Sequence, residues 1–166
     1  MPEQSDDTLS ERQLFGTAEH PITLIAVVST MAGGFAGLLA MLPTAVGIPW
    51  FLGLFRLRPP TGLSSTFGLP ASELVAVSVF ALGGIVVLPL FFIATATYLP
   101  PYDPAYARGI TIGTIFWPGF LIIFWPAGDL AASLAFVVFS LVSHLVYGLV
   151  LGLVVHTLTG IPEHEV

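Results

Sequence analysis

The longest uncharged stretch of the sequence sets the strongest limit on its fold. It runs from Leu130 to Val155 without an Asp, Glu, Lys or Arg. About 20 apolar residues, in a helix that rises about 1.5 Å per residue, are enough to cross the hydrocarbon core of a bilayer. Asp129 stands directly before the stretch, where its carboxylate can cap the helix N-terminus. These features predict a transmembrane helix over residues 130–157.

Three more apolar stretches predict further spans, at residues 22–42, 72–98 and 109–125. The predicted fold class is therefore all-α: a polytopic membrane protein with a four-transmembrane-helix bundle. Composition agrees, because only 8% of the residues are charged, whereas a soluble domain carries about 25%. The predicted parts are an acidic flexible N-terminal tail (1–20), the transmembrane domain (21–160) and a short C-terminal tail (161–166).

Prolines are expected to divide these spans. The first apolar run is longer than one span, and Pro43 and Pro49 are expected to break it and leave a short interfacial piece. In the second span Ser72 is placed to cap the helix, and Pro89 is expected to kink it. Pro118 is expected to interrupt the third span.

Charge and cysteine content limit the possible chemistry, source and localisation of the protein. The chain has ten acidic residues, four arginines and no cysteine, so disulfide and thiol chemistry are excluded for it. Acidic tails without lysine favour a halophilic source. An even number of spans places both tails on one side, but the arginines divide equally between the two sides and leave the orientation open. Because the N-terminus does not resemble an export signal, we favour cytoplasmic tails and a multi-pass protein of the cell membrane.

Four residues of the last span predict an intramembrane polar seam: Ser140, Ser143, His144 and Tyr147. His144 lies near the expected midplane. An ionisable residue there is by default a functional hypothesis, because neutral imidazole can serve as a ligand, proton carrier or hydrogen-bond partner. The structural alternative, which we favour, is a hydrogen bond between helices that contributes about 0.6–2 kcal/mol.

The histidines are the candidate ligands for a metal ion or a haem. His20, His156 and His164 fall on the tail side near acidic residues, but no pair has the helical spacing of a metal clip, so we interpret them as interfacial. A haem held by two histidines needs an axial ligand on each face, and only His144 lies deep in a span. No metal and no cofactor are therefore predicted, although a haem shared with another subunit stays open.

Known catalytic and nucleic-acid motifs are missing from the sequence. It contains no phosphate-binding glycine loop, no H-E-x-x-H, no G-x-S-x-G and no basic patch. We therefore predict no catalytic residues, no enzyme activity of its own and no nucleic-acid partner.

Glycines in G-x-x-x-G spacing predict close helix packing. The three pairs are Gly33/Gly37, Gly109/Gly113 and Gly148/Gly152. Such flat faces bring helices together through van der Waals contact in lipid. The contact can lie within this bundle or with a partner subunit.

Two motifs carry a family resemblance. The pattern SHLVYGLVLG at Ser143–Gly152, preceded by RG-x-x-x-G at Arg108–Gly113, resembles a group of small four-helix membrane proteins of haloarchaea. Some of that group look like companions of haem-copper terminal oxidases. The resemblance implies a non-catalytic accessory subunit of such a respiratory chain complex, packed in the lipid bilayer against oxidase subunits. The alternative from the residues is a stand-alone small transporter or channel-like bundle of unknown substrate, as a homo-oligomer.

Overall fold

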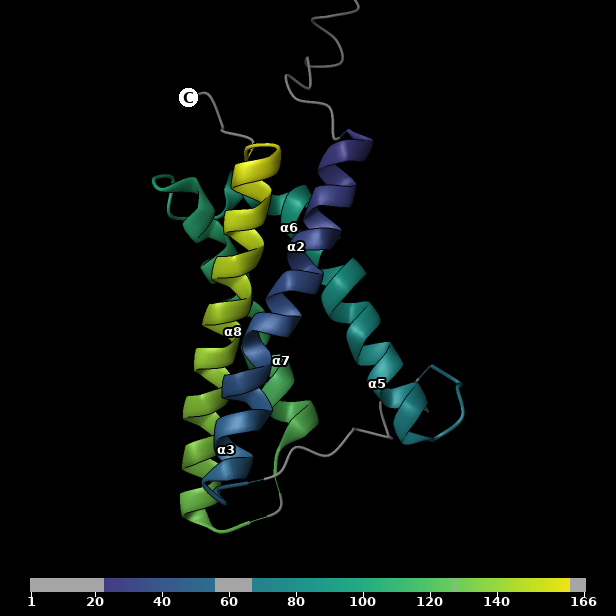
Figure 1. Ribbon diagram of the computed structural model, residues 1–166, viewed down its shortest axis with the longest axis vertical. Coiled ribbons are helices and arrows are strands. Elements are labelled where there is room, and N and C mark those ends of the chain that lie inside the picture. The colour runs from purple at the N-terminus through teal and green to yellow at the C-terminus, as the bar shows by residue number, and fades with distance from the viewer. Residues whose placement is uncertain (1–22, 56–66, 127, 162–166) are drawn as a thin grey trace, which may run out of the picture.

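The computed structural model describes residues 23–55, 67–126 and 128–161, and that part of the chain is helical without any strand (Figure 1). The first span, Leu24–Phe51, consists of α2 (Leu24–Leu42), a π-helical segment η1 (Pro43–Gly47) and α3 (Ile48–Phe51). The second, Glu73–Tyr98, consists of α5 (Glu73–Leu82), a second π-helical segment η2 (Gly83–Val87), α6 (Leu88–Thr95) and the 3-10 turn η3 (Ala96–Tyr98). The third, Ala105–Phe124, joins the 3-10 turn η4 (Ala105–Ala107) to α7 (Arg108–Phe124), and the fourth is α8 (Leu130–Leu158). The predicted all-α bundle is confirmed.

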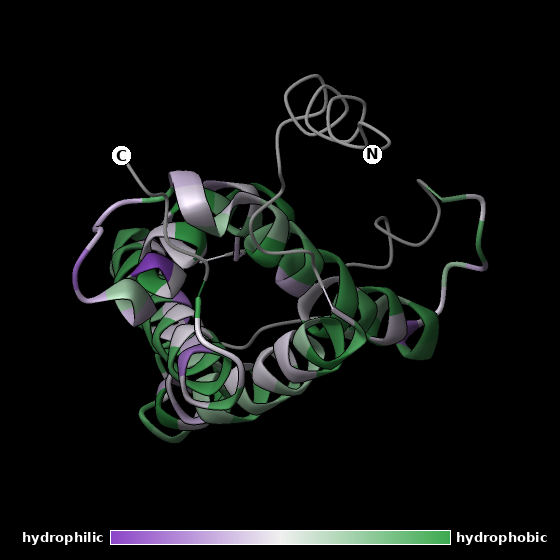
Figure 2. Ribbon diagram, turned by 90° about the horizontal axis from the view of Figure 1, so that it is seen from above, coloured by the Kyte–Doolittle hydropathy of each residue, from purple (hydrophilic) through white to green (hydrophobic). Residues whose placement is uncertain are grey.

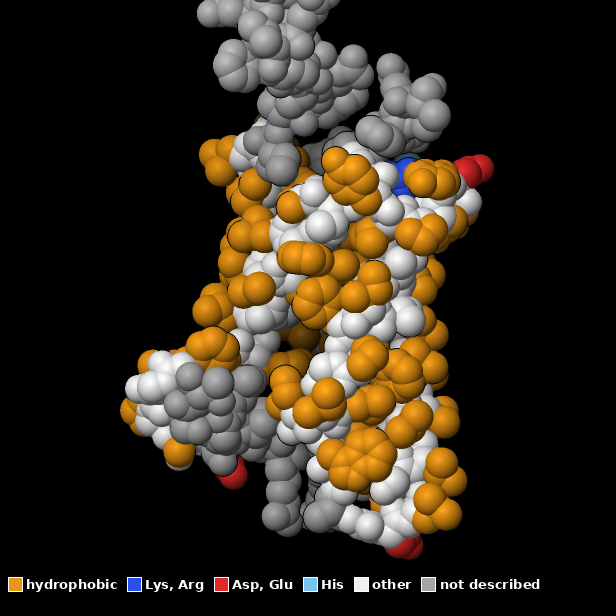
Figure 3. Space-filling view, turned by 180° about the vertical axis from the view of Figure 1, so that it is seen from behind, with side chains coloured by type: hydrophobic (Ala, Val, Ile, Leu, Met, Phe, Trp, Pro, Cys, Tyr) orange, Lys and Arg blue, Asp and Glu red, His pale blue; other side chains and the backbone are white. Residues whose placement is uncertain are grey.

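All four spans are long and apolar enough to cross a membrane. Seen from above, the helices consist mostly of hydrophobic residues (Figure 2). From the side, charged side chains lie at the two ends, and hydrophobic ones cover the wall between them (Figure 3). This distribution is the one a bilayer selects, because charges are expensive in its core.

Side-chain caps set where three of the spans begin. Ser72 Oγ accepts from the Val75 amide at 3.2 Å, and Asp129 Oδ1 accepts from the Ala132 amide at 2.9 Å. Each satisfies an amide that has no partner in the first helical turn. Both predicted caps are confirmed, and Thr23 caps α2 in the same way.

The predicted break of the first span was wrong. The helix continues through Pro43 and Pro49, because η1 widens it by one residue: the Ile48 amide bonds Pro43 O, five residues back. A π turn absorbs the proline ring without ending the helix. A true break would have exposed backbone groups to lipid, which offers them no partner.

Proline is accommodated within the other spans as well. The perturbation expected at Pro89 takes the form of η2, which directly precedes α6. The interruption expected at Pro118 does not occur, since α7 is continuous from Arg108 to Phe124. The predicted interfacial piece and the two tails extend into residues 56–66, 1–22 and 162–166, which lie outside the described residues.

The last span is the centre of the bundle. α8 packs along α2 on one side and along α7 on the other, while α2 also contacts α6 and η2. α5 leans away from the other helices at its N-terminal end (Figure 1), and Ala76 is its one buried residue. The bundle is therefore tight around α8 and loose around α5.

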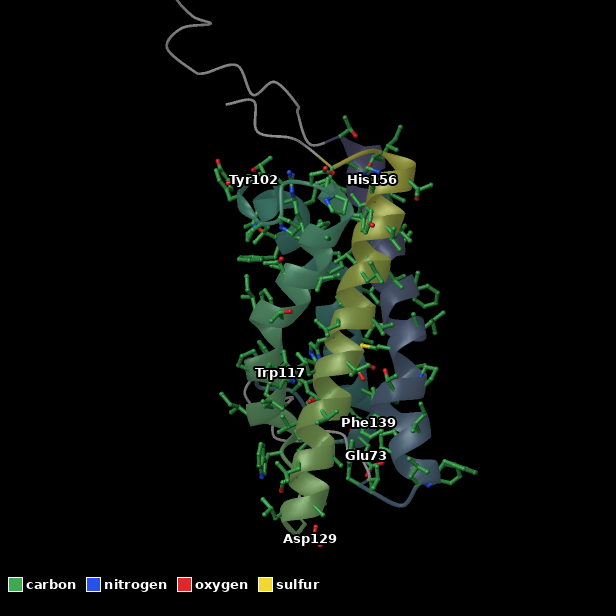
Figure 4. The ribbon with its side chains drawn as sticks, turned by 90° about the vertical axis from the view of Figure 1, so that its left-hand side faces the viewer. Glu73, Tyr102, Trp117, Asp129, Phe139 and His156 are labelled. Atoms are coloured by element: carbon green, nitrogen blue, oxygen red, sulfur yellow. The ribbon has the colours of Figure 1, made fainter. Side chains whose placement is uncertain are left out.

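The arrangement makes a testable prediction of topology. The start of α2 and the end of α8 lie at one end of the bundle (Figure 1), whereas Asp129 lies at the end opposite His156 (Figure 4). Because the chain has no cysteine, single cysteines at Thr23 and Thr157 should react with an impermeant thiol reagent from the same side. A cysteine at Asp129 should react from the other side. Labelling of positions 23 and 157 from opposite sides would contradict the four-span fold.

Candidate functional site: a polar seam along α8

The predicted polar seam lies in the buried part of α8. His144 is at the midpoint of Leu130–Leu158, and Trp117, which faces the same level from α7, is near mid-height of the bundle (Figure 4). Ser140, Ser143, His144 and Tyr147 are all buried. The structure therefore places the four residues inside the bundle, where each must find a partner other than water.

His144 makes its hydrogen bond within its own helix. Its Nδ1 lies 2.8 Å from Ser140 O, one turn earlier. A carbonyl oxygen can only accept, so Nδ1 carries the proton and Nε2 keeps its lone pair in the neutral ring. Across the helix interface the ring meets Phe120 of α7 edge to face, with centroids 4.8 Å apart. Its contact between helices is therefore aromatic, and its hydrogen bond is not the interhelical bond that we had favoured.

Ser140 provides a polar link between α7 and α8. The indole Nε1 of Trp117 donates to Ser140 Oγ at 3.0 Å, and Ser140 Oγ donates in turn to Val137 O at 3.1 Å. The indole N–H of a buried tryptophan needs such an acceptor. The pair fixes the rotation of α7 against α8 at this level.

Ser143 faces the first span, at the π-helical segment η1. Its hydroxyl lies 2.9 Å from Thr44 Oγ1 and 2.6 Å from Phe139 O, while Thr44 donates to Met41 O at 3.0 Å. The two hydroxyls therefore meet where α2 passes into η1.

Tyr147 completes the backbone of the second π-helical segment. Its hydroxyl donates to Gly84 O at 2.6 Å. In an α-helix Gly84 O would accept from the Leu88 amide, but that amide bonds Gly83 O instead. The next residue is Pro89, which has no N–H to offer. Tyr147 thus supplies a hydrogen bond that neither helical register can supply.

Both π-helical segments follow one local pattern. Pro49 follows Thr44 by five positions, Pro89 follows Gly84 by five positions, and both prolines are fully buried. In each case a side chain of α8 contacts the residue whose carbonyl the proline leaves without an amide partner. Sequence reasoning identified Gly84 as a point of close helix approach but missed the role of its carbonyl, and it missed Thr44 altogether. The proline five positions further on is the signal that could have found both.

The six glycines of the predicted packing pairs all lie at helix contacts within the chain. Cβ atoms added to Gly109 and Gly148 would each collide with the backbone oxygen of the other, and one added to Gly113 would collide with His144 O. At Gly37 an added Cβ would lie 2.9 Å from Tyr147 O. Gly33 meets Leu151, and Gly152 meets Tyr106. The close approach of α7 and α8 is therefore possible only with glycine at these positions.

Arg108 is a buried cation, which sequence reasoning used for orientation and as the first residue of the RG-x-x-x-G motif. It is 1% exposed, and its guanidinium donates to Pro101 O and Tyr102 O, both at 3.2 Å. The Tyr102 ring lies 5.8 Å from the guanidinium carbon, within range of a cation–π contact. Arg108 thus holds the connection between the second and third spans against the start of α7.

Residues 24–166 match a family model described as a family of unknown function, DUF6789. The chain belongs to the DUF6789 family. No curated protein and no solved structure matches it. The match covers all four spans of the chain.

In the described part of this DUF6789 chain, no three His, Cys, Asp or Glu residues lie close enough together to hold a metal ion. His156 is exposed at the end of α8, with its ring 6.0 Å from that of Tyr106. His20 and His164 lie outside the described residues. The polar seam is thus a row of hydrogen-bonded hydroxyls, those of Ser140, Ser143 and Tyr147, with the His144 imidazole among them.

The geometry of His144 predicts how the DUF6789 bundle responds to its replacement. His144→Leu keeps an apolar contact with Phe120 and removes only a bond inside α8, so we expect a loss below about 1 kcal/mol. His144→Gln should behave similarly. Denaturation of the purified variants in mixed micelles measures both. A loss of several kcal/mol in His144→Leu would show that the imidazole holds helices together.

Proposed function

We propose that the chain is a non-catalytic accessory subunit of a larger complex in the cell membrane, with a respiratory haem-copper terminal oxidase as its partner. The resemblance of Ser143–Gly152 and Arg108–Gly113 to haloarchaeal companions of such oxidases supports the choice of partner. The observation that carries the proposal is the state of α5, whose apolar side chains face outward.

α5 offers the surface on which a partner helix can pack. Leu74, Val77 and Leu82 are 77%, 50% and 57% exposed. Phe80 of α5 contacts α7, where its ring centroid lies 5.2 Å from that of Phe124. Because lipid gives no hydrophobic reward for packing, a partner would bind there through shape and van der Waals contact.

The interior argues against the alternative of a stand-alone transporter. Transporters direct unwound helix ends and free carbonyls at their substrate. Here the carbonyl freed in η2 is bonded by Tyr147, and the hydroxyl of Thr44 beside η1 is engaged by Ser143. The irregular backbone therefore serves packing of the bundle rather than a transport path.

The experiment is affinity purification of the full chain from native membranes in mild detergent. We expect a haem-bearing partner in the complex. Single cysteines at Val77 on α5 and at Val138 on α8, both exposed, provide matched cross-linking positions. Capture of the partner should be stronger from position 77. Recovery of the chain only as a homo-oligomer would overturn the proposal and favour the transporter.

A further inference from the structure

One polar atom of the seam, His144 Nε2, has no hydrogen-bond partner among the described residues. The ring bonds only through Nδ1, to Ser140 O. No fully buried side-chain nitrogen or oxygen in the described part of the chain lacks a partner. Nε2 is therefore not fully enclosed by the described residues.

A hollow lies on the face of the bundle between α5 and α6 on one side and α7 on the other (Figure 3). We name it the lateral hollow. Two aromatic contacts join these helices. The ring centroids of Phe91 and Phe116 are 5.5 Å apart, and those of Phe80 and Phe120 are 6.1 Å apart. Phe120 is also the residue against which His144 packs. The imidazole thus packs against a phenylalanine that also forms the contact between α5 and α7.

Two glycines of these helices have free space beside them. Gly83 and Gly119 lie on the stretches between the two aromatic contacts, and a Cβ added to either would meet no atom within 4 Å. At the glycines of the α7–α8 interface an added Cβ would instead collide with backbone. The lateral hollow lies on the outer face of the bundle (Figure 3), which faces lipid in a membrane, so a molecule dissolved in the bilayer can enter it from the side.

We propose that the lateral hollow, with His144 Nε2 at its inner end, binds a lipid-soluble phenol or hydroquinone. A lone pair in apolar surroundings calls for a hydroxyl donor, since an acceptor without a partner costs free energy there. Phenylalanine rings at the wall favour a flat aromatic body, which can stack on them or meet them edge to face. Entry from lipid requires an apolar tail. The site is independent of which complex the chain joins.

The test compares two ligands that differ only in the donor: radiolabelled decyl-hydroquinone and its dimethyl ether, each titrated onto the full chain in lipid nanodiscs. We expect saturable binding of the hydroquinone and about tenfold weaker binding of the ether, the value of one hydrogen bond. His144→Leu should abolish this preference. His156→Leu, a histidine change on the exposed end of the same helix, should leave it intact.

Nitrogen NMR of the wild-type chain labelled with 15N-histidine provides a second measurement that needs no variant. The Nε2 resonance of His144 should show an unprotonated nitrogen that moves toward the hydrogen-bonded position with hydroquinone and not with the ether. Equal binding of the two ligands, binding of neither, or an Nε2 resonance that ignores both would overturn the proposal. In those cases the space beside the ring would hold water or lipid only.

Discussion

Gly109→Ala is expected to destabilise the bundle by about 3 kcal/mol, at the upper end of the range for overpacking. The added methyl group would collide with Gly148 O and lie 2.8 Å from the Gly152 amide nitrogen. Both obstacles are helix backbone, so neither can rotate aside, and α7 and α8 must separate along their shared face. Denaturation of the purified chain in mixed micelles, followed by loss of helicity, measures the effect.

Gly119→Ala is the matched control on the same helix. It makes the same chemical change where an added Cβ meets nothing within 4 Å. Its expected effect is between zero and a small gain, since alanine favours the helix over glycine. Equal losses in the two variants would mean that glycine acts through backbone freedom and not through close approach of the helices.

Tyr147→Phe should cost about 1–2 kcal/mol, the second largest effect. It leaves the ring in place next to Gly37 and removes only the hydroxyl that bonds Gly84 O. The Gly84 carbonyl then has no hydrogen-bond donor from Tyr147. The Leu88 amide bonds Gly83 O, and Pro89 has no N–H to donate. The same denaturation assay measures the loss, and isotope-edited infrared spectroscopy of Gly84 should show a carbonyl stretch at higher frequency.

Tyr102→Phe is the control for removal of a phenolic hydroxyl. Tyr102 is 68% exposed, and its ring, which contacts Arg108, is kept. We expect a change below about 0.5 kcal/mol. A Tyr147→Phe variant as stable as this control would refute the role assigned to the Tyr147 hydroxyl in closing η2.

Spans and caps could be predicted because they depend on local chemistry. The uncharged length of 130–157 is enough to specify a crossing, and Asp129 and Ser72 cap their helices through bonds that reach three residues. The π-helical segments could not be predicted in this way. Pro49 and Pro89 indicate that a carbonyl five positions earlier lacks its amide partner, but the side chain that contacts that residue comes from α8, far along the chain.

The contacts of the seam depend on how α7 and α8 are rotated against each other. Once Gly109 is placed opposite Gly148, steps of four residues in opposite directions bring Trp117 near Ser140. The glycine spacings were visible in the sequence, but their pairing with each other was not. The lateral hollow was out of reach as well, because it depends on the lean of α5, which no single helix encodes.

The central position of α8 has a consequence for biosynthesis. Ribosomes deliver the chain from its N-terminus, so α8 is the last span to enter the bilayer. Until then the glycine faces of α2 and α7 lack the helix that they contact, since Gly37 meets Tyr147 and Gly109 meets Gly148. Before α8 inserts, the first three spans are therefore held only by the contacts among themselves, such as those of α2 with α6 and η2.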